Sequence, residues 1–401
     1  IYRYMSYNFL KIYKYYFSKK LVFIFLMGIA SGIPLYLILS TLMIWLTREN
    51  IDLSTIGLFS LTQIPWSLKF LWAPIIDYYK IPFLHNYLGK RKSWLLITQF
   101  FLIISIILLG TNDPTSELFY TAFFALLVSF FSATQDIIID AYRIEILQES
   151  DQGAGAAMTQ AGYRVGGIIA GAGALYFREI MKWETVFILI ALFILILMIL
   201  TLFAPQSNEL SIKKSRGNNI GNNLLIFIKP LKEFFNRNSL LNTMLILLFI
   251  LFFKLGDVIA GVMANPFYVK LGFSNIEIAN VSKLYGVIAT LFGVFIGGWL
   301  VKKIGIIKSL FLAGFLQIFS NLLFVILSKI GPDYIFLIVT VSGENISGGL
   351  GSAAFVAYLS ILCNKKYTAT QYALLSSIMG IARTFLSSPS GYLVNFLGWP
   401  N

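Results

Sequence analysis

The sequence predicts an all-α protein that crosses a lipid membrane many times. Hydrophobic residues fill 58% of the 401 positions and charged residues only 12%, whereas a soluble domain is roughly half apolar and about a quarter charged. Uncharged stretches recur from one end of the chain to the other, and about 20 apolar residues suffice for one helical crossing. Basic residues gather in alternate breaks between these stretches, as they do in the cytoplasmic loops of polytopic membrane proteins.

The apolar stretches between polar breaks predict eleven helices. They span residues 21–47, 54–76, 93–111, 118–146, 155–177, 185–203, 239–268, 276–300, 308–328, 333–362 and 368–396. The first follows a basic segment, but it is longer than the roughly 7–15-residue apolar core of a secretory signal. We therefore interpret it as a membrane helix.

One long polar break, at 204–238, divides six helices from five. We expect an N-terminal six-helix repeat at 1–203, a cytoplasmic linker at 204–238 and a C-terminal repeat at 239–401. Weak internal symmetry supports this division, because Tyr142 followed by Arg164 has a counterpart in Tyr358 followed by Arg383. Six plus five helices lead us to expect that a twelfth helix is missing and that the sequence is incomplete.

The basic residues predict the orientation. If the N-terminus is cytoplasmic, 21 lysines and arginines fall in breaks on that side and five on the other. The positive-inside rule then places the N-terminus in the cytoplasm. The formal charge of +13 is explained by this topology, and we expect no nucleic-acid partner.

Few residues offer covalent or metal chemistry. Cys363 is the only cysteine and His85 the only histidine, so an intramolecular disulfide is impossible and a zinc cluster is not expected. A glycine-rich segment at 153–158 lacks the third glycine of a dinucleotide loop. Gly162 and Gly166 instead allow their helix to approach a neighbour closely. We predict no enzyme activity, no metal and no cofactor.

Ionisable residues inside membrane helices cost at least about 2.5–3.5 kcal/mol each at the bilayer centre and usually face a cavity or a partner. Asp136 and Asp140 are four residues apart and therefore share a helix face. For Asp140, Arg143 and Glu145, a structural charge cluster is one interpretation and a functional role the other. The ionisable residues within predicted helices are Lys69, Asp136, Asp140, Arg143, Arg164, Lys254, Asp257, Lys283, Glu344 and Arg383.

Two matched pairs of these residues suggest chemistry. Arg164 and Arg383 hold equivalent places in the two repeats, and a guanidinium matches a carboxylate bidentately. They bind substrate carboxylates or, alternatively, close salt bridges with acids of neighbouring helices. Asp136 and Glu344 lie deeper, on related helices, and we predict that they couple transport to protons. Asp257 is the next candidate.

Six strings along the chain resemble the AmpG muropeptide permeases and the related acetyl-coenzyme A transporters. They lie at 67–77, 91–99, 132–143, 254–257, 344–349 and 368–376. Asp77 and the basic residues at 90–92 match the loop between helices 2 and 3 of major facilitators, where an acid and a basic cluster can form a cytoplasmic lock; a cytoplasmic loop that is basic only because of its orientation is the alternative. A looser echo at 297–308 lacks the acid.

The resemblance implies the major facilitator fold and proton-driven import of anionic anhydro-muropeptides across the bacterial inner membrane for cell-wall recycling. A carrier of acetyl-coenzyme A or another organic anion is the alternative within the fold. A non-transporting receptor or anchor is the alternative from another class. We expect a monomer that binds a small-molecule substrate, protons and lipid.

The remaining predicted site residues fall into two groups. Those expected to line the substrate cavity are Lys69, Gln135, Tyr163, Arg164, Asn345, Gln371 and Arg383. Those expected to gate the cavity or to act as structural charges are Asp77, Arg91, Lys92, Asp140, Arg143 and Lys254.

Overall fold

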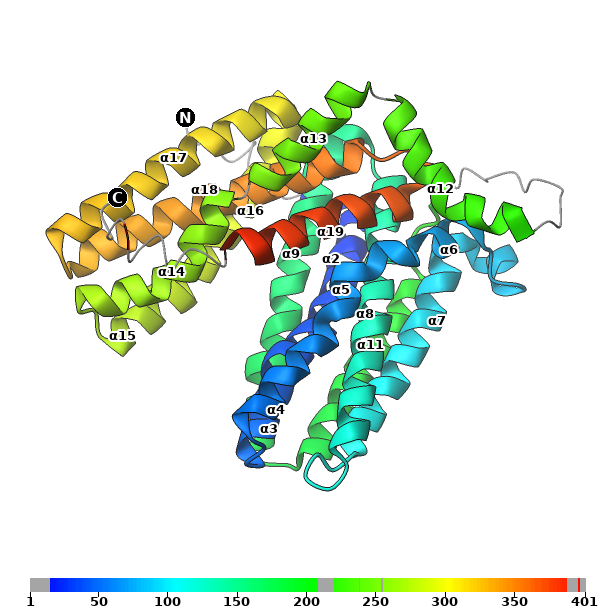
Figure 1. Cartoon of the computed structure of the whole chain (residues 1–401), viewed down its shortest axis with the longest axis horizontal. Helices are drawn as coiled ribbons and strands as arrows, with labels where there is room; N and C mark the ends of the chain where they lie inside the picture. Colours follow the sequence, from blue (N-terminus) through cyan, green and yellow to red (C-terminus); the bar gives the residue numbers. More distant parts are fainter. Residues whose placement is uncertain (1–14, 208–219, 238, 254, 388–395, 397–401) are drawn as a thin grey trace. The chain divides into compact units, whose positions relative to one another are not determined.

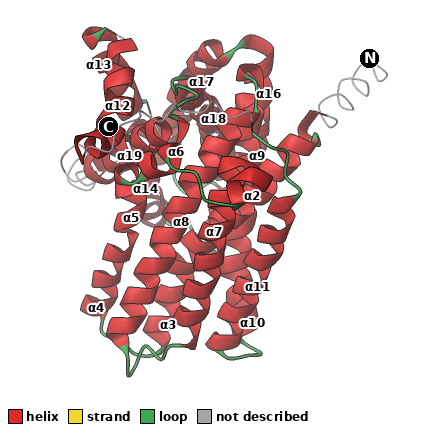
Figure 2. Cartoon of the chain, turned by 90° about the vertical axis from the view of Figure 1, so that its right-hand side faces the viewer, coloured by secondary structure: helices red, strands yellow, loops and turns green. Residues whose placement is uncertain are grey.

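The computed structural model describes residues 15–207, 220–237, 239–253, 255–387 and 396 (Figure 1). Within these ranges every regular element is a helix, as predicted (Figure 2). The chain forms two compact units. Unit 1 comprises Ile1–Gln148, Met158–Glu233 and Cys363–Ser377, and unit 2 comprises Glu149–Ala157, Phe234–Leu362 and Ile378–Asn401.

The long helices of unit 1 form a bundle around an apolar core. In the core, the indole rings of Trp45 and Trp183 stack at 5.6 Å, and Phe187 packs beside Trp45. Two π-helical turns, at Leu37–Leu42 and Ile169–Gly173, interrupt the α-helices. The helices are α2 (Lys19–Tyr36), α3 (Met43–Arg48), α7 (Leu84–Thr111), α8 (Leu118–Ile146), α9 (Gln152–Ile168, which begins in unit 2), α10 (Ala174–Arg178) and α11 (Trp183–Leu202).

The helix predicted at 54–76 is broken into short pieces. Pro65 and Pro74 lie in the first turns of α5 and α6, where a proline is tolerated because it removes no hydrogen bond that the turn needs. Each proline also prevents the preceding helix from continuing as a regular α-helix. The pieces are α4 (Leu53–Leu58), a 3₁₀ turn (Phe59–Gln63), α5 (Ile64–Leu68), a second 3₁₀ turn (Lys69–Leu71) and α6 (Ala73–Tyr78).

Unit 2 is built mainly from long helices of the second half of the sequence, with α18 packed along both α16 and α17. Its helices are α13 (Leu240–Phe252), α14 (Leu255–Leu271), α15 (Asn275–Ile278), a π-helix (Ala279–Tyr285), α16 (Gly286–Ile304), α17 (Ile306–Ile330) and α18 (Tyr334–Ile361). Two further helices belong to both units, namely α12 (Ile220–Arg237) and α19 (Thr368–Ser387).

Six helices of the described residues are long and apolar enough to cross a membrane. A seventh candidate is the pair Leu225–Arg237 and Leu240–Phe252, which is bent by 104°. The six are Lys19–Arg48, Leu84–Thr111, Leu118–Ile146, Trp183–Leu202, Ile276–Ile304 and Ile306–Ile330.

Several predicted boundaries agree with the structure and others do not. The helix predicted at 118–146 is α8, residue for residue. The helix predicted at 93–111 begins earlier, at Leu84, and is kinked at Gly89, whose φ is 75°. The polar break at 204–238 was predicted to be a linker without a helix, but it contains the helix α12. The last predicted helix is described only to Ser387 and at 396.

Glycines let α2 and α9 cross in close contact, as predicted for Gly162 and Gly166. A methyl carbon on Gly162 would overlap the carbonyl oxygen of Phe25, and one on Gly166 would overlap that of Ile29. On the facing helix, a methyl carbon on Gly32 would overlap the carbonyl oxygen of Tyr163. Any larger side chain would therefore push the two backbones apart.

Candidate functional site

Asp77, in the last turn of α6, caps the amino terminus of α19. Its carboxylate accepts hydrogen bonds from the backbone N–H of Ala369 at 3.2 Å and of Thr370 at 2.8 Å, and from the Thr370 hydroxyl at 2.7 Å. The first turn of a helix leaves such N–H groups without an intrahelical partner, and its dipole favours a negative charge. An acid from the first half of the sequence therefore holds a helix from the second half.

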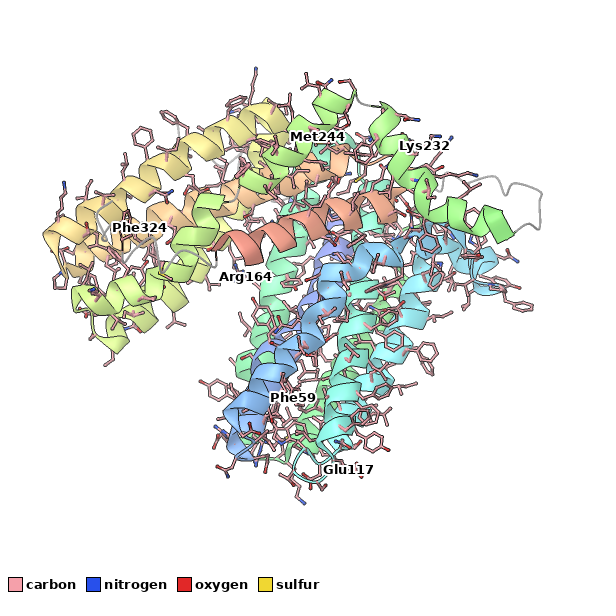
Figure 3. All side chains as sticks on the ribbon, in the orientation of Figure 1. Phe59, Glu117, Arg164, Lys232, Met244 and Phe324 are labelled. Carbon is pink, nitrogen blue, oxygen red and sulfur yellow. The ribbon has the colours of Figure 1, made fainter. Side chains whose placement is uncertain are left out.

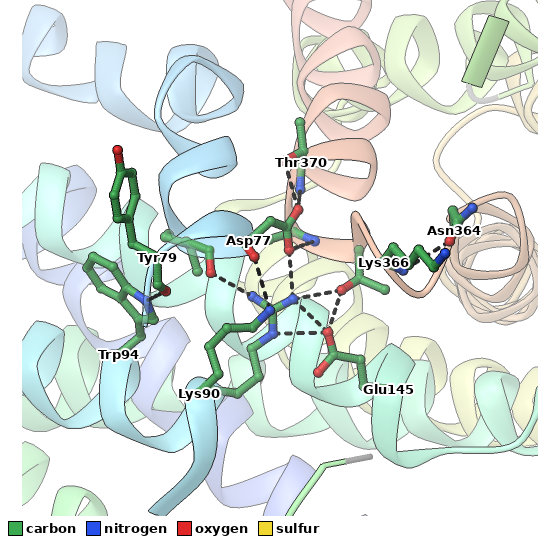
Figure 4. Close-up of polar contacts among 12 residues, drawn as sticks. Asp77, Tyr79, Lys90, Trp94, Glu145, Asn364, Lys366 and Thr370 are labelled. Carbon is green, nitrogen blue, oxygen red and sulfur yellow. Dashed lines mark hydrogen bonds and ion pairs between the residues drawn. The ribbon is translucent and has the colours of Figure 1, made fainter. Parts of the chain in front are cut away.

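Arg91 joins this acid to a second one. Its Nη2 donates to Asp77 Oδ1 at 2.7 Å and to Glu145 Oε1 at 2.6 Å, and its Nε donates to the same Glu145 oxygen at 3.0 Å. The Thr368 hydroxyl accepts from Arg91 at 2.9 Å and donates to Glu145 at 2.6 Å. We call Asp77, Arg91, Glu145, Thr368 and Thr370 the Arg91 cluster (Figure 4).

The Arg91 cluster is closed to water. The side chains of Arg91 and Asp77 are 1% and 2% exposed, so their attraction is screened little by solvent. Lys90 donates to the backbone carbonyl of Asp77 at 3.1 Å and brings a second positive charge to the two acids. Removing any one charge would leave the others buried without compensation.

The kink at Gly89 aims the basic residues that follow it. With φ at 75° and ψ at 171°, Gly89 adopts a backbone conformation that other residues rarely reach.

Lys92, which was predicted as a gating residue, is not part of the Arg91 cluster. Its ammonium donates to the carbonyls of Leu202 at 3.2 Å and Ala204 at 3.0 Å, at the end of α11.

Gln371 connects α19 to α12. Its Nε2 donates to Glu233 Oε2 at 2.6 Å and to the carbonyl of Pro230 at 3.0 Å, and its Oε1 accepts from the backbone N–H of Asn364 at 2.7 Å. Gln371 directly follows Thr370, which is bound to Asp77. The residue predicted to line the cavity thus takes part in a network beside the Arg91 cluster, and its substrate role stays a prediction.

Tyr367 lies in the loop that precedes α19, outside the membrane-spanning segments. Burial, followed by the negative charges of Glu233 and Asp77, raises the pKa of its phenol. The phenol is therefore neutral at physiological pH. It adds no charge to the Arg91 cluster.

A second polar group surrounds Asp136 in the middle of α8. The Ser31 hydroxyl on α2 donates to Asp136 Oδ1. Lys69 and Tyr163 interact electrostatically with the Asp136 carboxylate, and Lys69 is 9% exposed. We call Ser31, Lys69, Asp136 and Tyr163 the Asp136 cluster. It brings together an acid, a hydroxyl, an ammonium and a phenol, which are groups able to pass or hold a proton.

Other predicted residues of α8 hold the bundle together. Gln135 is fully buried and donates to the carbonyl of Ala30 on α2 at 2.8 Å. Asp140 pairs with Arg143 at 3.3 Å, and the Arg143 guanidinium lies over the ring of Tyr372 at 5.3 Å from its centre. These contacts are structural, and any further role of the three predicted residues remains a prediction.

In unit 2, Asn345 and Glu344 lie on α18. Asn345 accepts from the Thr290 hydroxyl at 2.6 Å and donates to the carbonyl of Val341 at 2.9 Å. Glu344 is half-buried and interacts electrostatically with Tyr268. The structure therefore places Glu344 near other polar groups inside its unit.

The basic segment at 297–308, which resembles the 77–92 loop but lacks its acid, pairs with an acid from another part of the chain. Lys302 Nζ lies 3.0 Å from Asp151 Oδ1, in the turn that precedes α9, with the two side chains 43% and 26% exposed. Close packing accompanies this pair, because a methyl carbon on Gly153 would overlap Cβ of Val301. The pair is far more exposed to water than the Arg91 cluster.

Some predicted residues lie outside the described part of the structure. Lys254 falls between described ranges, and the side chains of Asp257 on α14, Lys283 in the π-helix and Arg383 on α19 are not described. Arg164 is exposed on α9 (Figure 3). The roles of Arg164 and Arg383 in the substrate cavity, of Lys254 as a gating or structural charge and of Asp257 in proton coupling stay predictions.

The partner of Glu145 was not predicted from the sequence. Its spacing suggested a cluster with Asp140 and Arg143, whereas the structure pairs Glu145 with Arg91. The spacing itself argued against that cluster. Asp140 and Glu145 are five residues apart, so they point roughly 140° away from each other on a helix of about 3.6 residues per turn. The threonines of α19 were part of a family string, and nothing local showed that they would meet Asp77.

Comparison with known proteins places the chain in a family. The profile of the Major Facilitator Superfamily matches residues 21–387. A putative transporter named AmpG 4 from Rickettsia conorii is 39% identical over 97% of this chain and 92% of its own length. The anhydromuropeptide permease of Escherichia coli K12 is 36% identical over 98% of this chain and 78% of its own length. The chain belongs to the AmpG family of the major facilitator superfamily.

Solved structures agree with this assignment at the level of the fold. The human organic anion transporter MFSD10 superposes on this AmpG-family chain with a TM-score of 0.68 at 13% identity, covering 95% of each chain. The proton:xylose symporter XylE gives 0.63 at 14% identity, covering 96% of this chain and 92% of its own. The AmpG-family chain is a multi-pass membrane transporter, as the sequence predicted, because its relatives of 39% and 36% identity are named as a transporter and a permease and not as enzymes.

Proposed function

We propose that this chain imports anionic anhydro-muropeptides across the bacterial inner membrane, with its N-terminus in the cytoplasm and the proton gradient as driving force. The main support for this cargo is that the chain is 36% identical, over 98% of its length, to an anhydromuropeptide permease. The excess of basic residues in alternate loops supports the orientation.

The Arg91 cluster is our proposed cytoplasmic gate. It binds the first turn of α19 to α6, α7 and α8, and its charges are buried. A buried ion cluster is strongly stabilised only while all partners are present. The arrangement observed is the closed one, and we propose that the gate opens when α19 separates from Asp77 and these charges meet water, which would give the cluster the two arrangements that gating requires.

The Asp136 cluster is our proposed proton site on the first repeat, with Glu344 as its relative on the second and Asp257 as a further candidate. Ser31 can donate to an ionised Asp136, and Lys69 balances its charge. Protonation of Asp136 would release Lys69 for a carboxylate of the cargo. Lys69, Arg164 and Arg383 are the basic residues that we propose for cargo binding.

Cargo competition tests the proposal. The full chain, reconstituted in vesicles, takes up labelled N-acetylglucosaminyl-anhydro-N-acetylmuramyl tripeptide, and unlabelled muropeptide or acetyl-coenzyme A is added as competitor. We expect muropeptide to abolish uptake of the label and acetyl-coenzyme A to leave it unchanged. The reverse order of competition, or no uptake at all, would contradict the proposed cargo.

A further inference from the structure

The helix α12 carries an exposed face that combines large apolar side chains with lysines. Leu225, Ile228, Lys229 and Lys232 follow one another at spacings of three, one and three residues, which places them on one side of a helix. Leu225 is 38% exposed and Ile228 51%, and both lysines are exposed; Lys232 is labelled in Figure 3. The buried Phe234 lies on the opposite side.

We propose that this face of α12 lies on the membrane surface and binds the anionic phospholipid headgroups of the cytoplasmic leaflet, so that lipid holds the gate closed. An amphipathic helix with lysines beside its apolar residues lies in the interface, with apolar groups in the acyl boundary and ammonium groups at the phosphates. Anionic headgroups match the charge of Lys229 and Lys232.

Two features of the chain support this location. The helix α12 ends at Arg237, and α13 begins at Leu240 with its own cap, because the Ser239 hydroxyl accepts from the backbone N–H of Asn242, so α12 is a helix separate from the apolar one that follows. The inner side of α12 is also anchored beside the Arg91 cluster, through the bonds of Gln371 to Glu233 and to the Pro230 carbonyl.

The bonds of Gln371 to Glu233 and Pro230 connect the lipid-binding helix α12 to the gate. Gln371 follows Thr370, and Thr370 is held by the Asp77 carboxylate. A helix fixed on headgroups keeps Glu233 in place and thereby keeps the first turn of α19 against Asp77. This coupling rests on the gate proposed above, whereas lipid binding by α12 does not.

Fluorescence quenching tests the lipid contact. In a Cys363→Ser background, Ile228→Cys carries bimane, and the full chain is placed in phosphatidylcholine vesicles to which brominated phosphatidylglycerol or brominated phosphatidylcholine is added. We expect half-maximal quenching at a much lower content of the anionic lipid. Lys229→Gln and Lys232→Gln should each raise that content about fivefold, the equivalent of about 1 kcal/mol per basic residue near an anionic surface. Equal quenching by both lipids, unchanged in the lysine variants, would overturn the proposal.

Lys182→Gln is the matched control, because it removes the same charge from an exposed site next to the start of α11. The end of α11 lies beside the gate, where the Leu202 carbonyl binds Lys92, so Lys182 is at the far end of that helix. We expect the Lys182→Gln variant to be quenched like the parent. A shift as large as that of the α12 variants would show a general charge effect and overturn the assignment to α12.

Labelling of a buried gate position tests the coupling. Ala369 is 1% exposed, and its backbone N–H donates to Asp77, so in the Cys363→Ser background Ala369→Cys keeps that bond and should react with a maleimide only when the gate opens. We expect a several-fold faster reaction in pure phosphatidylcholine than with phosphatidylglycerol. An unchanged rate, with quenching intact, would overturn the coupling. If Asp77→Asn also leaves the rate unchanged, the gate itself is wrong, and the quenching result stands without it.

Discussion

At the scale of single residues, Arg91 has more polar partners in the structure than the sequence predicted. One guanidinium serves two carboxylates and a threonine hydroxyl, and it also donates to the Ile76 carbonyl at 3.3 Å. Pairing of Asp77 with the basic loop was predictable, because the string is characteristic. The additions of Glu145 and Thr368 were not, because their meeting depends on helix rotation and on contacts between residues far apart in the sequence.

Arg91→Gln should destabilise the protein strongly. The change leaves Asp77 and Glu145 buried without their shared cation, and breaking a buried ion pair in this way costs about 3–5 kcal/mol of unfolding free energy. Lys302→Gln is the control, because its pair with Asp151 is partly exposed and exposed pairs contribute about 0–1 kcal/mol. Denaturation in detergent measures both. Equal stability of the two variants would contradict a structural role of the Arg91 cluster.

Asp136→Asn should separate accumulation from exchange. The amide imitates the protonated acid, so the carrier cannot release a proton, and uptake against a gradient should fall to background. Exchange between loaded vesicles should persist in part, because exchange does not require the empty carrier to return. Asp140→Asn is the comparison, since loss of the pair with buried Arg143 should lower the yield of folded protein instead. Protonophore-sensitive accumulation by Asp136→Asn would exclude this acid as the proton carrier.

At the scale of elements, helix positions were predictable and helix interruptions were not. Apolar length alone located α8 at 118–146. The predicted helix at 54–76 is broken next to Pro65 and Pro74, because a proline interrupts a regular α-helix. The apolar composition of the stretch, on which the prediction rested, does not reveal such a break. The helix α12 was missed because asparagines and lysines around 213–232 hid the helical spacing of its apolar residues.

The crossing of α2 and α9 predicts a sharp difference between two glycines. Gly162→Ala would place its methyl group against the Phe25 carbonyl oxygen, whereas a methyl group at Gly171 meets nothing within 4 Å. Overpacking of this kind typically destabilises by about 1–3 kcal/mol. We expect Gly162→Ala to lower the melting temperature and Gly171→Ala to leave it nearly unchanged. Similar losses for the two variants would mean that the helices do not cross as described.

At the scale of the whole molecule, the orientation in the membrane can be tested across α7. This helix is kinked at Gly89 and ends at Thr111, so residues before the kink and residues after Thr111 lie on opposite sides if the part between them spans the bilayer. In a Cys363→Ser background, we expect Thr115→Cys to react with an impermeant maleimide added to intact cells and Tyr87→Cys to react only after permeabilisation. Both positions are exposed. Reaction of Tyr87→Cys from outside would reverse the proposed orientation.

The proposed function of the whole molecule is to concentrate a muropeptide by means of a proton gradient. The most direct measurement is uptake of labelled anhydro-muropeptide by right-side-out vesicles that contain the full chain, with an acidic outside and with the gradient collapsed by a protonophore. We predict accumulation above the external concentration only with the gradient, and none in vesicles that contain the Asp136→Asn variant. Accumulation that is unaffected by the protonophore, or its absence under both conditions, would contradict the proposed function.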